Sequence, residues 1–131
     1  MTKPRKSAPP SVLVLTRDER LLRLIELAVA EIRPLPAVSR IELGAEFLQA
    51  LQLLRPALAV LDDGADDMDG QRLLAAARGR NDRVPLVFLA PEHSPDLERD
   101  SRSLGVFAYF SRPIEEERFT QVIQAAVRLR G

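Results

Sequence analysis

Short apolar runs recur along the chain at intervals of roughly two dozen residues, and each is followed by a segment of helical periodicity. The five runs lie at 12–15, 37–40, 57–61, 85–89 and 106–110. The first reads VLVL, continuous rather than alternating, as is typical of a strand buried on both faces of its sheet. This rhythm predicts βα units built around a parallel sheet.

Helix signals occupy the intervals between the runs. Asp18 is expected to cap a first helix whose apolar face reaches Ile32 and which Pro34 and Pro36 stop. Ser94 and Pro95 resemble an N-cap followed by proline at the first helical position. The other helices are expected at 45–54, at 71–78 with its end near Gly79, at 95–104 with its end at Gly105, and at 115–129.

The chain of 131 residues is long enough for one core. Residues 1–10 are basic and rich in proline, which predicts a disordered leader, and 11–131 form the folded domain. With 19 basic and 19 acidic residues, the chain lacks the basic excess of nucleic-acid binders. It has no cysteine and no apolar run of membrane-spanning length, so we expect a cytoplasmic protein without disulfides or thiolate metal sites.

Functional residues of open parallel sheets gather beyond the carboxyl ends of the strands. The residues at these positions are Thr16, Arg17 and Asp18; Asp62, Asp63 and Gly64; Ala90 and Pro91; and Ser111, Arg112 and Pro113. Neither a triad around His93, the only histidine, nor a glycine-rich phosphate loop can be recognised. The acids between Asp63 and Asp69 fail the calcium-loop spacing, which predicts a solvated acidic loop.

Three stretches together resemble the receiver domains of response regulators: PALAVLDDGADDMDG at 56–70, VPLVFL at 84–89 and GVFAYFSRP at 105–113. The resemblance covers nearly the whole chain after the leader. It implies a flavodoxin-like α/β fold, a doubly wound five-stranded parallel sheet of order 2-1-3-4-5. It also places the family's phosphate-accepting aspartate at Asp62.

The sequence departs from the family at several of these positions. The acidic pair that holds Mg²⁺ is replaced by Thr16 and Arg17, so the acidic pocket formed by Thr16, Arg17, Asp18 and Gly64 is degenerate. Ala90 stands where a hydroxyl is usual, and Arg112 replaces the family's lysine before Pro113. Tyr109 occupies the position of the switching aromatic residue, for which we favour a static role.

Mg²⁺ requires oxygen ligands in near-octahedral geometry, and the lost acidic pair removes two of them. We therefore expect no metal and no other cofactor, with Mg²⁺ relevant only if Asp62 accepts a phosphoryl group. One hypothesis is that Arg17 or Arg112 neutralises Asp62 in place of the metal. The alternative is that both arginines point into water and that Asp62 is an ordinary carboxylate at a strand end.

These observations predict a stand-alone atypical receiver, or pseudo-receiver, that acts as a signalling interaction module and not as an enzyme. One alternative is a working phosphoacceptor that a histidine kinase phosphorylates on Asp62, and a second is a small-ligand sensor that uses the strand-end crevice. We expect a protein partner, either a kinase or a downstream signalling protein, and neither nucleic acid nor membrane. The resemblance implies partner binding or homodimerisation through the fourth helix, fifth strand and fifth helix, a face that includes Arg99, Arg102, Tyr109, Arg118, Asp100 and Glu116.

Overall fold

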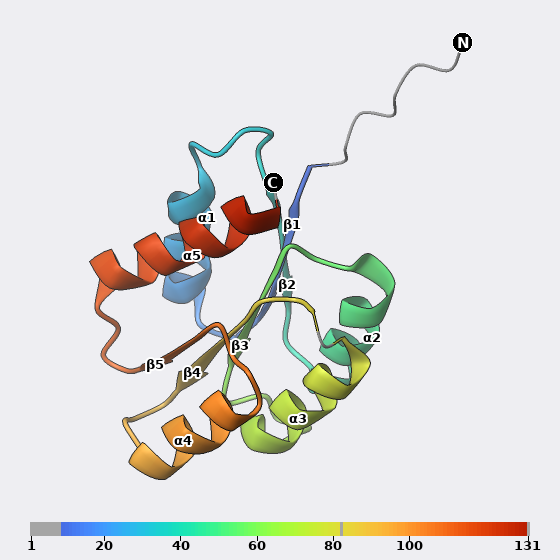
Figure 1. Ribbon diagram of the computed structural model, residues 1–131, viewed down its shortest axis with the longest axis vertical. Helices are drawn as coiled ribbons and strands as arrows, with labels where there is room; N and C mark the ends of the chain where they lie inside the picture. Colours follow the sequence, from blue (N-terminus) through green and yellow to red (C-terminus); the bar gives the residue numbers. More distant parts are fainter. Residues whose placement is uncertain (1–8, 82, 131) are drawn as a thin grey trace.

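A five-stranded parallel sheet forms the centre of the structure, a computed structural model that describes residues 9–81 and 83–130 (Figure 1). Its strands are β1 (Ser11–Leu15), β2 (Ala37–Ile41), β3 (Leu58–Asp62), β4 (Leu86–Ala90) and β5 (Ala108–Ser111). They lie in the order β2-β1-β3-β4-β5. The predicted fold class and strand order are therefore confirmed. Most of the predicted leader, residues 1–8, lies outside the described residues.

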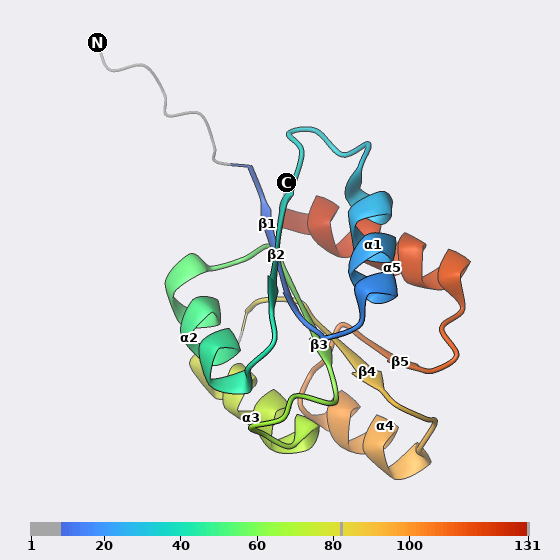
Figure 2. The same ribbon diagram turned by 180° about the vertical axis from the view of Figure 1, so that it is seen from behind.

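Helices cover both faces of the sheet, as the two opposite views show (Figures 1 and 2). They are α1 (Glu19–Val29), α2 (Gly44–Leu54), α3 (Gly70–Arg80), α4 (Pro95–Ser103) and α5 (Glu116–Arg130). Helices α1 and α5 pack on one face, and α2, α3 and α4 lie on the other. No helix among the described residues has the length and apolar character needed to cross a membrane.

Alternate residues of the central strands enter two separate cores. In β1, Val12 and Val14 face α1 and α5, whereas Leu13 and Leu15 face α2 and α3. Because both sets are buried, the run is continuously apolar instead of alternating. The edge strand β2 has no fully buried residue, which explains its weak sequence signal.

Three predicted element boundaries differ from the structure by two residues or more. Helix α1 ends at Val29, before its proline stop, because the chain turns there and Ile32 enters the core from outside the helix. Helix α3 continues through Gly79 to Arg80, where Asn81 is extended and its side chain accepts from the backbone of Val84. Strand pairing in β5 begins only at Ala108.

Candidate functional site at the carboxyl ends of the strands

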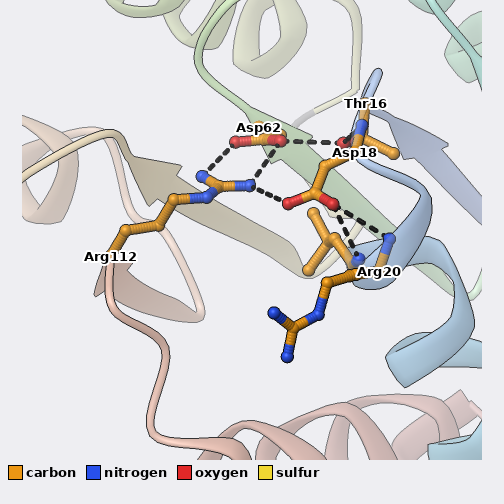
Figure 3. Close-up of polar contacts among 6 residues, drawn as sticks. Thr16, Asp18, Arg20, Asp62 and Arg112 are labelled. Carbon is orange, nitrogen blue, oxygen red and sulfur yellow. Dashed lines mark hydrogen bonds and ion pairs between the residues drawn. The ribbon is translucent and has the colours of Figure 1, made fainter.

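Asp62 is the last residue of β3 and is only 8% exposed. Arg112, which follows β5, binds its carboxylate with both terminal guanidinium nitrogens (Figure 3). Nη1 donates to Oδ1 over 2.7 Å and Nη2 donates to Oδ2 over 2.9 Å. This two-point geometry is the strongest form of a side-chain ion pair, because two parallel charge-assisted hydrogen bonds fix its direction.

Thr16 supplies a third hydrogen bond to the same carboxylate. It follows β1 and is 2% exposed, and its hydroxyl donates to Asp62 Oδ2 over 2.7 Å. The Thr16 hydroxyl oxygen in turn accepts from the backbone N–H of Asp18 over 2.9 Å. Pairing of Leu15 with Leu61 brings the residues that follow them, Thr16 and Asp62, side by side.

Asp18 completes the arrangement from the start of α1. Its Oδ1 caps the helix by accepting from the backbone N–H groups of Arg20 and Leu21, as predicted. Its Oδ2 accepts from Arg112 Nη2 over 3.0 Å. This bond lowers the pKa of Asp18, and the two carboxylates raise the pKa of Arg112 further above its ordinary value. We call Asp62, Arg112, Thr16 and Asp18 the Asp62 cluster.

Arg17 does not contribute to neutralising Asp62. Its Nη1 donates to both carboxylate oxygens of Asp66, over 2.8 and 2.7 Å, and its Nε lies 3.9 Å from Glu42 Oε1. The side chain is more than half exposed. Of the two arginines considered as metal replacements, only Arg112 contacts Asp62.

The acidic loop between β3 and α3 is largely exposed, and its carboxylates also form specific hydrogen bonds. Asp67 accepts from the first two N–H groups of α2, at Gly44 over 2.7 Å and at Ala45 over 3.0 Å, which lowers its pKa. Asp69 caps α3 through the N–H of Arg72. These carboxylates supply the caps that the two helices need, because the first N–H groups of a helix have no partner within it.

Asp63 lies on the inner side of this loop. Burial is the main cause that raises its pKa, and the negative charges of Asp69 and Asp62 raise it further. A β-carbon on Gly70 would lie 2.4 Å from the Asp63 carboxyl group, so glycine is needed there for close approach. Gly64 has a φ of +145° and lines a pocket that opens beside Asp62.

The two switch-equivalent positions are both buried in the core on the side of α2 and α3. Ala90 ends β4 and offers no hydroxyl. Tyr109 is 4% exposed, stacks on Phe88, and its hydroxyl accepts from the backbone N–H of Ser94 over 3.3 Å. Pro113 follows Arg112 through a cis peptide bond and lines a neighbouring groove.

A pocket of about 330 Å³ opens above the Asp62 cluster, where the resemblance implies Mg²⁺. Both oxygens of Asp62 and both of Asp18 already accept hydrogen bonds, and a guanidinium group occupies the space between these carboxylates. No group of three His, Asp or Glu side chains within the described part of the chain is placed to hold a metal. In this arrangement the residues do not fit Mg²⁺, which needs several free oxygen ligands.

Sequence reasoning missed the hydroxyl of Thr16 and the bridging role of Asp18. In the sequence, Thr16 stands out only as a replacement for a carboxylate, and Asp18 only as a helix cap and a member of the degenerate acidic pocket. The alternation of side chains along a strand could have indicated which residue faces Asp62. Because consecutive residues point to opposite sides, Thr16 and Arg17 cannot both face it. The roles that the resemblance assigns to these residues stay predictions.

No protein-family model matches the chain. Two curated proteins do: the transcriptional regulatory proteins GlrR of Escherichia coli K12 and QseF of Escherichia coli O157:H7. Each is 28% identical over 120 residues, which cover 91% of this chain. The match covers 26% of each relative's length, so the chain corresponds to about a quarter of those proteins.

Solved structures agree on the fold. The signal receiver domain of a putative Luxo repressor protein from Vibrio parahaemolyticus superposes with a TM-score of 0.79 at 20% identity, covering 93% of this chain and 92% of that one. A CheY-like response regulator receiver domain protein from Methanospirillum hungatei JF-1 gives 0.78 at 18% identity, covering 93% and 96%. The resemblance found in the sequence is thus confirmed, and the chain has the fold of a response-regulator receiver domain.

Proposed function

We propose that this domain is an atypical response-regulator receiver, a non-enzymatic and cytoplasmic signalling module that binds a protein partner without Mg²⁺-assisted phosphorylation of Asp62. The observation that carries the proposal is the two-point bond from Arg112 to Asp62. A phosphoryl acceptor needs a carboxylate oxygen free to attack, and here hydrogen bonds from Arg112 and Thr16 engage both oxygens.

Charge supports the same conclusion. Phosphoryl transfer to a carboxylate brings two anionic groups together, and catalysis depends largely on cations positioned at the transferred group. The cation beside Asp62 is the guanidinium of Arg112, which also pairs with Asp18. Releasing Asp62 for reaction would leave a nearly buried carboxylate without its partner, a costly state.

The test is intact-mass spectrometry after incubation with Mg²⁺ and acetyl phosphate. We expect no phosphoryl adduct, under conditions in which a conventional receiver in the same experiment is fully modified. A stoichiometric adduct that Asp62→Ala abolishes would overturn the proposal. It would instead establish the second candidate, a phosphoacceptor receiver served by a histidine kinase.

One observation favours that second candidate enough to keep it in the test. Asp62 ends β3 at the edge of an open pocket, so a small phosphodonor can approach. A solved structure with the same fold is described as the phosphorylated cyanobacterial phytochrome response regulator RcpA, with a TM-score of 0.72 and 22% identity. Arg112→Lys is the informative variant, because lysine has one nitrogen and cannot bind both oxygens at once. An adduct in Arg112→Lys alone would assign the block to the guanidinium.

The partner surface implied by the resemblance is the face of α4, β5 and α5. Here Arg118 lies 4.7 Å from the ring centre of Phe110, and Glu98 pairs with Arg102 beside a groove of about 280 Å³. A homodimer through this face should depend on Arg118. Light scattering of the parent and of Arg118→Glu tests it, and a monomeric parent at high concentration would exclude the homodimer.

A further inference from the structure

A further groove, about 590 Å³ in volume, lies at the end of the sheet opposite the Asp62 cluster. It is bounded by the start of β1, the connection from α1 to β2, and the ends of α2 and α5. In both ribbon views the first described residues, that connection and the end of α5 gather at the same end of the molecule (Figures 1 and 2). Its apolar walls include Pro10, Ile32, Pro34, Leu54, Pro56 and Val127. We call it the basic groove.

Among the described residues, three arginines line the basic groove against one acid, Glu31. Arg33 already has partners within the fold, because its Nη1 donates to the carbonyls of Ala30 and Ile32. Arg55 and Arg128 are exposed, and neither forms a hydrogen bond or ion pair with any residue in the described ranges. Two cations therefore face the groove without a counter-ion.

Arg55 also has an unusual backbone conformation. It is the C-cap of α2 with φ +46° and ψ +62°, in the left-handed region. Glycine is the usual residue there, because a β-carbon is disfavoured in that conformation. A strained position that carries a long, unpaired cation is a reason to look for a binding role.

Interaction with the carbonyls at helix C-termini explains only one of the three arginines of the basic groove. Cations near helix C-termini interact favourably with the terminal carbonyls. Arg33 makes such contacts, but the guanidinium groups of Arg55 and Arg128 contact no carbonyl among the residues that the structure describes. Their donors remain available to a ligand.

We propose that the basic groove binds an acidic peptide segment of a partner protein, one that carries apolar side chains between its carboxylates. The carboxylates would pair with Arg55 and Arg128, and the apolar side chains would contact Leu54, which is 56% exposed, and the proline walls. No aromatic residue in the described part of the chain lines the groove, whereas stacking on aromatic side chains is the usual means of holding single-stranded nucleic acid. The segment 1–8 carries Lys3, Arg5 and Lys6, so its charge does not suit the groove. This inference goes beyond the proposed function and does not depend on the state of Asp62.

Fluorescence anisotropy of the full chain tests the proposal, with a short fluorescein-labelled peptide rich in Asp, Glu and Leu as the probe. We expect saturable binding that weakens as salt rises. Arg55→Gln combined with Arg128→Gln should raise the Kd about tenfold, a size typical of losing two exposed charge pairs. Arg23→Gln is the matched control, because Arg23 is an exposed arginine of α1 outside the groove.

Further arms separate the components of the interaction. Leu54→Ser, or a probe in which serine replaces leucine, should weaken binding if the apolar walls take part. Asp62→Ala should leave the Kd unchanged, which keeps this result separate from the phosphorylation test. The proposal is overturned if the peptide does not saturate, if Arg23→Gln weakens it as much as the double variant does, or if a single-stranded oligonucleotide binds more tightly than the peptide.

Discussion

Charged side chains at the two ends of the sheet differ in whether they have partners among the described residues. At the carboxyl ends of the strands, Asp18, Asp62, Asp66 and Asp67 each accept hydrogen bonds from a guanidinium, a hydroxyl or backbone N–H groups. At the other end, Arg55 and Arg128 have no such partner among the described residues. Paired charges at the first end maintain the structure, whereas unpaired charges at the second are available to another molecule. The end that the resemblance marks as reactive is thus the one whose named aspartates already have partners.

The largest effect should come from removing the cation of the Asp62 cluster. Arg112→Met leaves Asp62 and Asp18 facing each other without a counter-ion, and we expect the free energy of unfolding to fall by about 2–3 kcal/mol. This lies at or below the low end for buried pairs because the Arg112 side chain is 29% exposed. Urea denaturation measures it. Arg17→Met is the control and should lose less than about 1 kcal/mol, because its pair with Asp66 is exposed. Equal losses would contradict the contrast between the two arginines.

Two glycines of α3, one near each end of the helix, should respond in opposite ways to substitution by alanine. Gly70→Ala should destabilise by about 1 kcal/mol, because the new methyl group displaces the Asp63 carboxylate from the Gly70 N–H. Gly79→Ala should instead stabilise by up to about 1 kcal/mol, because nothing lies within 4 Å of its β-carbon. Thermal and urea unfolding of both variants measure these effects. If adding Asp63→Ala does not restore the stability lost in Gly70→Ala, the close approach of these two residues is not the cause of the loss.

At the basic groove a substitution should stabilise the fold while weakening binding. Arg55→Gly relieves the left-handed strain and should raise the free energy of unfolding by about 1 kcal/mol. The same variant loses a groove cation, so its affinity for the acidic peptide should fall. Arg55→Ala keeps the strain and should lose affinity without gaining stability. A gain in stability in both variants would mean that charge repulsion, and not backbone conformation, is the cost at this position.

The smallest effect concerns Asp63, whose raised pKa marks a charge that the folded state disfavours. A carboxyl group with a pKa higher in the folded than in the unfolded chain destabilises the fold above that pKa and ceases to do so once protonated. Asp63→Asn should therefore stabilise at neutral pH, and the gain should fade as pH drops through the folded pKa, which burial and the neighbouring carboxylates raise above the ordinary value. Exposure to water keeps the gain small. Urea titrations at neutral and acid pH measure it, and a gain that persists in acid would exclude this origin.

The fold was largely predictable because strands buried on both faces of a sheet have continuously apolar sequences. Continuous apolar runs marked β1, β3 and β4, and glycine marked the turn after α4, where Gly105 has φ +75°. Helix ends were less predictable. Gly79 continues α3 in ordinary helical conformation, and Ile32 reaches the core from a turn instead of from a helix face.

The Asp62 cluster was only half predictable. The sequence placed arginines after two strand ends, but which one reaches Asp62 depends on side-chain direction across the sheet. Thr16 points inward and Arg17 outward, so only Arg112 is available. The capping of α2 by Asp67, across 23 positions of the chain, depends on tertiary placement that no local pattern records.

The reach of Arg112 along the chain also bears on the kinetics of folding. Its bonds span 50 positions to Asp62 and 94 to Asp18, and so join the first strand region to the last. The entropic cost of closing a stretch of chain rises with its length, so we expect these bonds to form late in folding. Interactions absent from the transition state slow unfolding without speeding folding. The guanidinium of Arg112 should therefore determine how long a folded molecule persists, while the apolar strands determine how quickly it forms.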